Sequence, residues 1–202
     1  MVRSLVFLVL FPLTVFGQDD FKKDGMLRAT ATFAVGRLLS YDISNAYLKG
    51  ELEYHIEEKI SLRGDTYVMM GSKSSEFFSL TNYHGSMAGI SYHFTENKKF
   101  DPYMGVQTGV ILSETQSEAG NLIIHLYTPN RKVIDPLVSL HAGFNYYASN
   151  YFHLFANLRY LNGIRNAPDS FNDMNELRLS FGLGFNIGVK SNKLKTHLPP
   201  SP

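Results

Sequence analysis

The seven histidines of this 202-residue chain are its first candidates for metal binding or acid–base catalysis. Imidazole is the commonest metal ligand in proteins and titrates near neutral pH. They are His55, His84, His93, His125, His141, His153 and His197. No His, Asp and Glu residues show the close spacing of a familiar metal site, and the chain has no cysteine for a thiolate site or a disulfide. We therefore expect no metal and no cofactor, and hydrogen-bonded histidines.

His84 and Ser86 are the one pair in the sequence that resembles a nucleophile beside its base. Glu76 is an acid that could approach them and complete the serine, histidine and carboxylate set of a hydrolase. A second polar segment, residues 159–163, contains neither serine nor histidine. We expect that the protein is not an enzyme, and a hydrolase remains the alternative.

Charged residues gather on one face of alternating segments. The set consists of Arg28, Lys49, Glu51, Glu53, Arg63, Asp65, Arg159 and Arg178. If residues 57–59 form a tight turn, Glu53 lies directly opposite Arg63 on the next strand. We expect these side chains to form an internal polar network. The formal net charge is only +1, so we expect no nucleic acid partner.

The segments that carry these residues alternate apolar and polar side chains with a period of two, which indicates β-strands. They occupy residues 28–38, 45–56, 60–70, 87–94, 103–112, 138–146, 152–160 and 177–189. At about 8–13 residues they exceed an average soluble strand and suit a strand that crosses a bilayer. Short connectors (57–59, 95–99 and 148–150) alternate with longer ones (40–44, 71–82, 113–135 and 163–175). This pattern predicts an all-β fold, an eight-stranded antiparallel up-and-down transmembrane β-barrel.

Side-chain volume and charge indicate which face of the strands contacts lipid. The apolar face carries bulky residues on every strand, more than the interior of an eight-stranded barrel can hold. The opposite face carries glycines such as Gly105, Gly143 and Gly182 together with the charges. Because a charge at the bilayer centre costs about 2–4 kcal/mol, we expect the apolar face outside and the polar face in the lumen. A secreted lipocalin-like barrel with a water-facing exterior is the soluble alternative.

Aromatic residues cluster beside the short connectors, as in the girdle at a membrane interface. The expected girdle consists of Tyr54, Phe94, Phe100, Tyr103, Tyr146, Tyr147, Tyr151 and Phe152.

Two segments resemble known strands. Residues 102–109 (PYMGVQTG) and 179–188 (LSFGLGFNIG) resemble strands of the small OmpA/OmpX-like outer-membrane barrels, of the outer membrane protein beta-barrel domain type. The resemblance extends over nearly all of residues 25–189 and is one of pattern. It implies a bacterial outer-membrane location, both termini in the periplasm, and contact with outer-membrane lipid and lipopolysaccharide.

The domain organisation follows from the chain ends. Residues 1–17 have a basic start and a short apolar run, which predicts a secretory signal peptide. Residues 18–25 are expected to be a periplasmic N-terminal segment, 26–189 the barrel, and 190–202 a disordered periplasmic tail.

Function is expected to reside in the long connectors. Leu122, Ile123, Ile124, Leu126 and Tyr127 form an apolar, β-prone core in the connector 113–135. This core either extends a hairpin above the membrane or binds a protein partner. We expect a structural, accessory or binding protein, and a subunit of a larger outer-membrane complex is one form of that role. A lipid-modifying hydrolase and a narrow porin-like channel are the alternatives.

Overall fold

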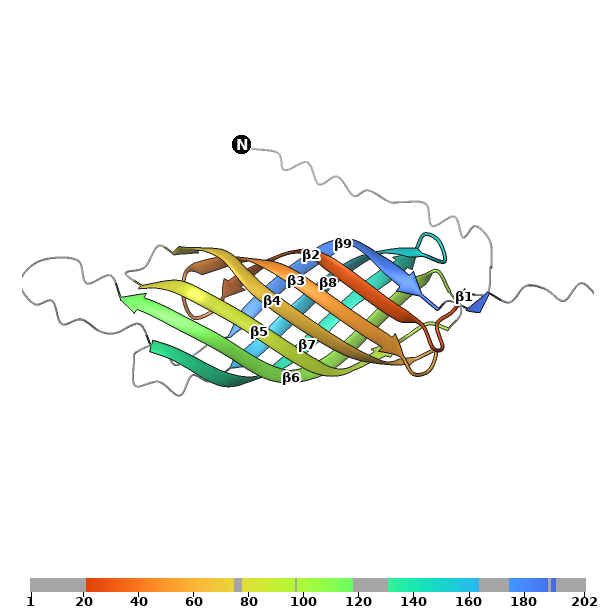
Figure 1. Cartoon of the computed structure of the whole chain (residues 1–202), viewed down its shortest axis with the longest axis horizontal. Coiled ribbons are helices and arrows are strands. Elements are labelled where there is room, and N and C mark those ends of the chain that lie inside the picture. The colour runs from red at the N-terminus through yellow and green to blue at the C-terminus, as the bar shows by residue number, and fades with distance from the viewer. Residues whose placement is uncertain are drawn as a thin grey trace, which may run out of the picture.

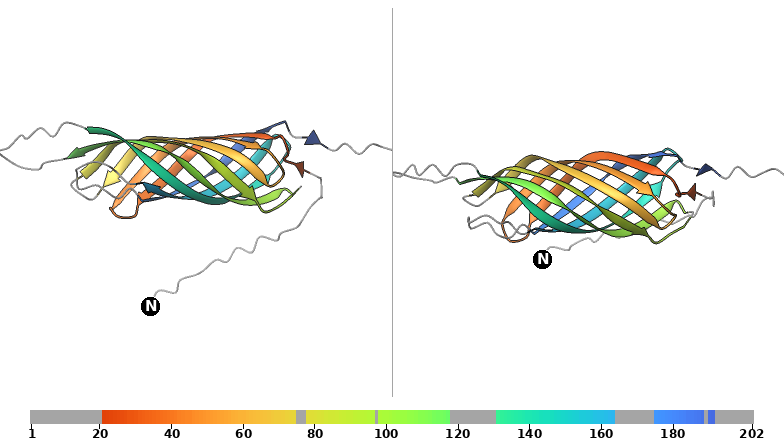
Figure 2. Two further views of the ribbon diagram at one scale, coloured as in Figure 1. Left: turned by 90° about the horizontal axis from the view of Figure 1, so that it is seen from below. Right: turned by 60° about the horizontal axis from the view of Figure 1, so that its bottom comes forward.

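Eight long strands close into one barrel in the computed structural model, which describes residues 21–74, 78–96, 98–117, 131–163, 175–188 and 190–191. The barrel strands are β2 (Leu27–Leu38), β3 (Ile43–His55), β4 (Ile60–Ser74), β5 (Phe78–His93), β6 (Phe100–Ser117), β7 (Arg131–Tyr147), β8 (Phe152–Gly163) and β9 (Glu176–Ile187). Each pairs antiparallel with its sequence neighbour, and β2 pairs with β9 to close the ring. Figure 1 shows the resulting tube of tilted strands, and the two views in Figure 2 show that it is closed on all sides. The predicted fold class is confirmed.

The two ends of the barrel differ. The turns between β3 and β4, β5 and β6, and β7 and β8 are short and lie together at what we call the short-turn end. A small antiparallel pair, β1 (Phe21–Lys22) with β10 (Lys190–Ser191), lies at this end as well. Residues 190 and 191 are thus paired in the structure, although we expected the whole tail 190–202 to be disordered. The remaining connections lie at the opposite end, which we call the loop end.

Strands β4 to β7 are longer than predicted, with 15, 16, 18 and 17 residues. The sequence placed loops at 71–82 and 113–135, but the ladder of β6 and β7 continues to the pair Thr115 and Arg131. Outward apolar residues give way to polar ones such as Asn82 and Lys132 in this region. The apolar alternation therefore stops before the backbone pairing does, so the sequence pattern underestimates the length of these strands.

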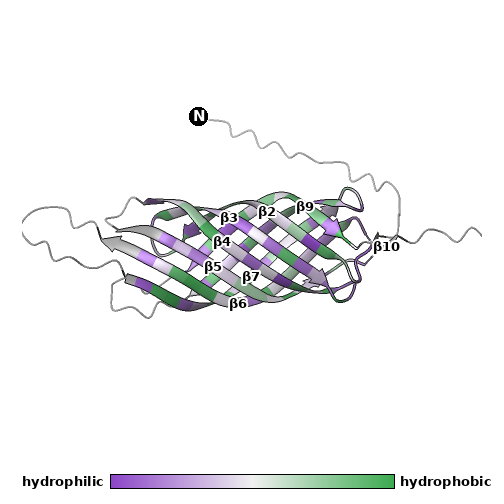
Figure 3. Cartoon of the chain, in the orientation of Figure 1, coloured by the Kyte–Doolittle hydropathy of each residue, from purple (hydrophilic) through white to green (hydrophobic). Residues whose placement is uncertain are grey.

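Apolar side chains cover the outside of the barrel. Phe33 is 70% exposed, Phe181 69% and Leu140 57%, and all eight strands contribute exposed apolar residues of this kind. Figure 3 shows hydrophobic and hydrophilic residues alternating along each strand. Within the described residues, no helix is long and apolar enough to span a membrane. The predicted girdle is wrong at two positions, because Tyr103 and Tyr147 are buried in the lumen by the same period-two alternation.

Candidate functional site

Ion pairs between neighbouring strands fill the middle of the lumen. Glu53 Oε2 on β3 accepts hydrogen bonds from Arg28 on β2 and from Arg63 Nη2 on β4, the latter at 2.7 Å. Glu51 accepts a 2.6 Å hydrogen bond from Lys49 Nζ and lies 3.4 Å from Arg63 Nη2. These five side chains are almost fully buried. Each charge has an opposite charge beside it, the condition under which ions are tolerated away from water.

A second group of contacts crosses the lumen. Arg159 Nη2 on β8 donates to Asp65 Oδ2 on β4 at 2.7 Å. Gln107 on β6 donates to the same carboxylate oxygen at 2.6 Å and accepts a hydrogen bond from Arg159. Strands β4 and β8 lie four positions apart in a ring of eight, so they face each other across the barrel. The pair therefore closes the lumen at this level.

Arg178 lies closer to the loop end, in a cage of tyrosines. Its guanidinium carbon is 4.1 Å from the ring centre of Tyr47 and 4.6 Å from that of Tyr67. Glu176, two residues earlier on β9, accepts hydrogen bonds from Arg178 Nη2 and from the Tyr47 hydroxyl, both at 2.7 Å. The ion pair with Glu176 and the contacts with the tyrosine rings compensate the positive charge of Arg178.

Apolar side chains fill the lumen beyond the tyrosine cage. Leu38, Ile43, Ile111, Leu137 and Leu161 are buried there in one cluster with the tyrosines. These side chains occupy the lumen toward the loop end, together with buried polar residues such as Ser113 and Asp135.

The short-turn end is closed by the N-terminal segment. A turn from Lys23 to Met26, with Gly25 at a φ of 73°, folds the segment over the barrel mouth. Only glycine adopts this φ without strain. Lys23 Nζ then donates to Asp101 Oδ1 at 2.8 Å, and Asp101 Oδ2 lies 2.8 Å from His93 Nδ1. Both Lys23 and Asp101 are fully buried.

The structure places all eight predicted network residues inside the lumen. Seven of them form one connected group, while Arg178 pairs with Glu176 in the tyrosine cage. Three further buried charges, Glu176, Asp101 and Lys23, were not predicted from the sequence. Glu176 and Asp101 occupy inward positions of their strands, a signal the alternation already contained. Lys23 precedes the first predicted strand, so no periodicity indicates that it enters the lumen.

Solved structures share this architecture. OprG from Pseudomonas aeruginosa superimposes with a TM-score of 0.57 at 14% identity, covering 82% of this chain and 97% of that chain. Neisserial surface protein A gives 0.55 at 14% identity, with 80% and 95% covered. Ail of Yersinia pestis gives 0.54 at 13%, with 81% and 99% covered. The chain has the fold of a small outer-membrane β-barrel. No family model matches it, and no curated protein does.

This outer-membrane barrel fold confirms the resemblance inferred from residues 102–109 and 179–188. Of the three candidate hydrolase residues, the structure describes His84 and Ser86. His84 and Ser86 occupy outward positions of β5. The Ser86 hydroxyl lies 3.3 Å from that of Thr66, and His84 Nδ1 accepts a hydrogen bond from the Met69 amide at 3.1 Å. Glu76 and the apolar core Leu122 to Tyr127 lie outside the described residues.

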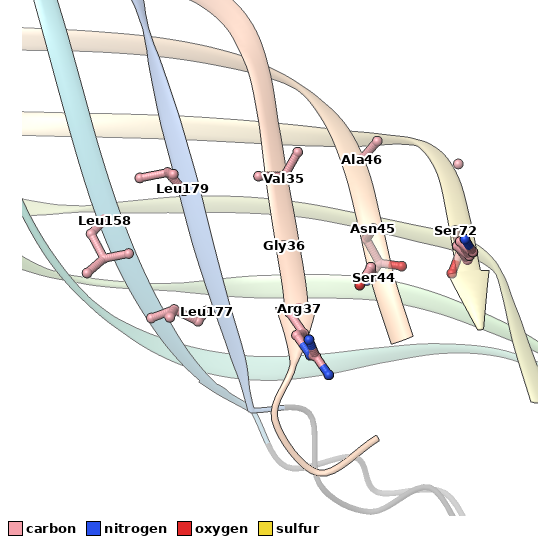
Figure 4. Close-up of a pocket in the computed structure, with 12 residues that line it drawn as sticks. Val35, Gly36, Arg37, Ser44, Asn45, Ala46, Ser72, Leu158, Leu177 and Leu179 are labelled. Carbon is pink, nitrogen blue, oxygen red and sulfur yellow. The ribbon is translucent and has the colours of Figure 1, made fainter. Parts of the chain in front are cut away.

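The outer surface of the barrel fold carries one groove that combines charge with apolar side chains. It has a volume of about 670 Å³ and runs from β8 across β9, β2 and β3 to β4 (Figure 4). Arg37, Ser44 and Lys73 lie in one row of paired residues across β2, β3 and β4. The next row toward the short-turn end contains Leu179, Val35, Ala46 and Gly71. The side chains of Arg37 and Lys73 therefore lie in one row, and the adjacent row consists of apolar and small residues.

Proposed function

We propose that the protein is an integral outer-membrane barrel with a sealed lumen, which acts as a structural, accessory or binding protein through its loop end. The observation that carries this proposal is the inside-out distribution of side chains. Large apolar residues are exposed on every strand, while arginines such as Arg63 and Arg159 are buried in the lumen. A lipocalin-like barrel in water needs the opposite distribution. The backbone closure also leaves no unpaired edge in hydrocarbon.

The proposed orientation puts the short turns and both termini in the periplasm. Bacterial outer-membrane barrels have short periplasmic turns and longer external strands and loops. In this chain β5 and β6 extend furthest at the loop end, where Phe78 pairs with Ser117. An epitope tag placed after Pro202 should be protected from added protease in intact cells, whereas a tag between residues 121 and 122 should be cleaved. The reverse pattern would overturn the orientation.

A protein partner is proposed to bind at the loop end, through the segment Leu122 to Tyr127. The support is its composition, since an apolar, β-prone segment in a long connector is suited to strand addition. Ail, which shares the fold, has been solved with the heparin analogue sucrose octasulfate, so a barrel of this kind can bind an external ligand. Deleting residues 121–127 should preserve heat-modifiable migration of the folded barrel and abolish partner pull-down from solubilised outer membranes. Unchanged pull-down would overturn the role of this segment.

Anionic lipid is the proposed partner of the groove at β2 to β4. Arg37 and Lys73 flank Ser44 at one level, where they suit a phosphate-bearing headgroup, and the apolar row beside them suits an acyl chain. Arg37 also pairs with Asp42 at 3.0 Å, so the headgroup would share this cation.

Native mass spectrometry of the barrel with added lipid A tests the lipid proposal. Lipid adducts should decrease several-fold in the double variant Arg37→Ser and Lys73→Ser. Lys132→Ser removes an exposed lysine from β7, away from the groove, and should leave the adducts unchanged. Equal adducts in all three proteins would overturn the assignment.

A further inference from the structure

His55 is buried at the short-turn end of the lumen without a hydrogen-bonding partner. Its side chain is 0% exposed, and neither ring nitrogen has a partner among the described residues. Buried polar groups are almost always paired, because an unpaired one loses its hydrogen bonds to water without replacement. Both ring nitrogens of His55 are therefore available to a ligand, and the ring is shielded from water.

Two further donors face this imidazole. The His93 ring centre lies 4.5 Å from that of His55. One ligand atom each from Glu53, His55 and His93 lie within 4.8 Å of one another. Two imidazoles and one carboxylate are a donor set that suits zinc and similar divalent transition metals.

The two carboxylate oxygens of Glu53 contact different residues. Arg28 and Arg63 both bind Oε2. Oε1 instead faces His93 Nε2 at 3.1 Å and accepts a hydrogen bond from Ser61. The arginines therefore leave Oε1 on the histidine side, where it can serve as a metal ligand while the ion pairs persist.

His93 is oriented as metal-binding histidines usually are. Its Nδ1 lies 2.8 Å from Asp101 Oδ2, so Nδ1–H can donate a hydrogen bond to the carboxylate, which leaves the lone pair on Nε2. Asp101 is itself held by Lys23 Nζ at 2.8 Å and by the Tyr147 hydroxyl at 3.2 Å. Ser61 Oγ lies 3.0 Å from His93 Nε2, close enough to supply a fourth ligand.

We propose that Glu53 Oε1, His55 and His93 Nε2 bind one divalent transition-metal ion of the zinc class at the short-turn end of the lumen. The site is structural, because it is buried and joins β3 to β5 beneath the N-terminal segment. No metal was expected from the sequence because these ligands come from two strands, and only the barrel register brings them to one level.

The test uses full-length mature protein with a histidine-free purification tag, refolded into detergent with Co²⁺ or Zn²⁺ and then dialysed. We expect one metal ion per barrel by elemental analysis and the visible absorption of four-coordinate Co²⁺. His55→Gln and His93→Gln should each lose both signals. His153→Gln is the matched control, since His153 is also buried in the lumen but pairs with Asn186 at 2.6 Å. It should keep the metal.

Heat-modifiable gel migration identifies variants that do not fold. If both histidine variants fail to fold, the wild-type barrel alone tests the proposal. A chelator should lower its Tm and abolish the Co²⁺ absorption. Wild-type barrel that retains no metal, or metal that His55→Gln and His93→Gln retain in full, would overturn the proposal. The test is independent of the proposed function, since a barrel without metal would still be an outer-membrane barrel.

Discussion

Arg159 and Asp65 meet from opposite sides of the barrel, with Arg159 Nη2 2.7 Å from Asp65 Oδ2. Both side chains are fully buried. A contact between two strands that face each other is possible only if the lumen is as narrow as two side chains. This one pair therefore links the strand number, the filling of the lumen and the absence of an open pore at that level.

Removing Arg159 should strongly destabilise the barrel. Arg159→Met removes the positive charge that pairs with the buried Asp65 carboxylate. Breaking a buried pair in this way typically costs about 3–5 kcal/mol. The free energy of unfolding is measured by urea titration in lipid vesicles. Lys59→Met is the control, because Lys59 and Glu96 form an exposed ion pair, and such pairs contribute little to stability. A loss as small for Arg159→Met as for the control would contradict the buried network.

Gly143 should not tolerate even one added methyl group. A Cβ there would lie 2.3 Å from the Ala156 carbonyl oxygen and 2.8 Å from the Tyr103 hydroxyl. Gly143→Ala should therefore destabilise the barrel by about 1–3 kcal/mol, the usual range for overpacking. Gly50→Ala is the matched change on the outer face, where a Cβ meets no atom within 4 Å. Equal stability of the two variants in the same urea titration would argue against this lumen packing.

A charge on the outer face should be tolerated only away from the membrane. Leu140, near the middle of β7, and Leu39, just beyond β2, are both 57% exposed. Leu140→Arg should cost about 2–4 kcal/mol in vesicles, whereas Leu39→Arg should change stability by less than about 1 kcal/mol. If the exterior faced water, both substitutions would be nearly neutral.

The sealed lumen predicts no channel activity. Purified barrel added to planar bilayers should leave the conductance at background, because ion pairs and the apolar cluster of Leu38, Ile43, Ile111, Leu137 and Leu161 fill the tube. The informative variants are Glu53→Ala and Arg63→Ala. Stable wild-type channels whose conductance shifts in either variant would place the current inside the lumen and contradict its closure.

The sequence predicts the barrel well because one physical constraint repeats along it. Every strand must expose apolar residues to lipid and turn polar ones inward, so residues such as Leu140 and His141 reveal their faces by alternation alone. The same constraint gave the inward positions of the eight network residues, and with them the pair Glu53 and Arg63 on adjacent strands.

Contacts between strands that are not adjacent in the barrel could not be predicted from the sequence. The pairing of Arg159 with Asp65 depends on shear and closure, and so does the approach of His93 to His55. Lys23 precedes the alternating pattern, so its entry into the lumen became visible only in the fold. The parts of β6 and β7 near the loop end were missed because outward residues there, such as Lys132, are polar.

We expect the apolar exterior of the barrel to lie in hydrocarbon. The accessibility of a fluorophore at a single position to quenchers tests this location directly. The chain has no cysteine, so Leu140→Cys and Leu39→Cys each accept a single polarity-sensitive fluorophore. In vesicles, the probe at 140 should emit at short wavelength and be quenched by acyl-brominated lipid, while the probe at 39 should be quenched by aqueous iodide. Iodide quenching at position 140, with the protein soluble after detergent removal, would contradict the account.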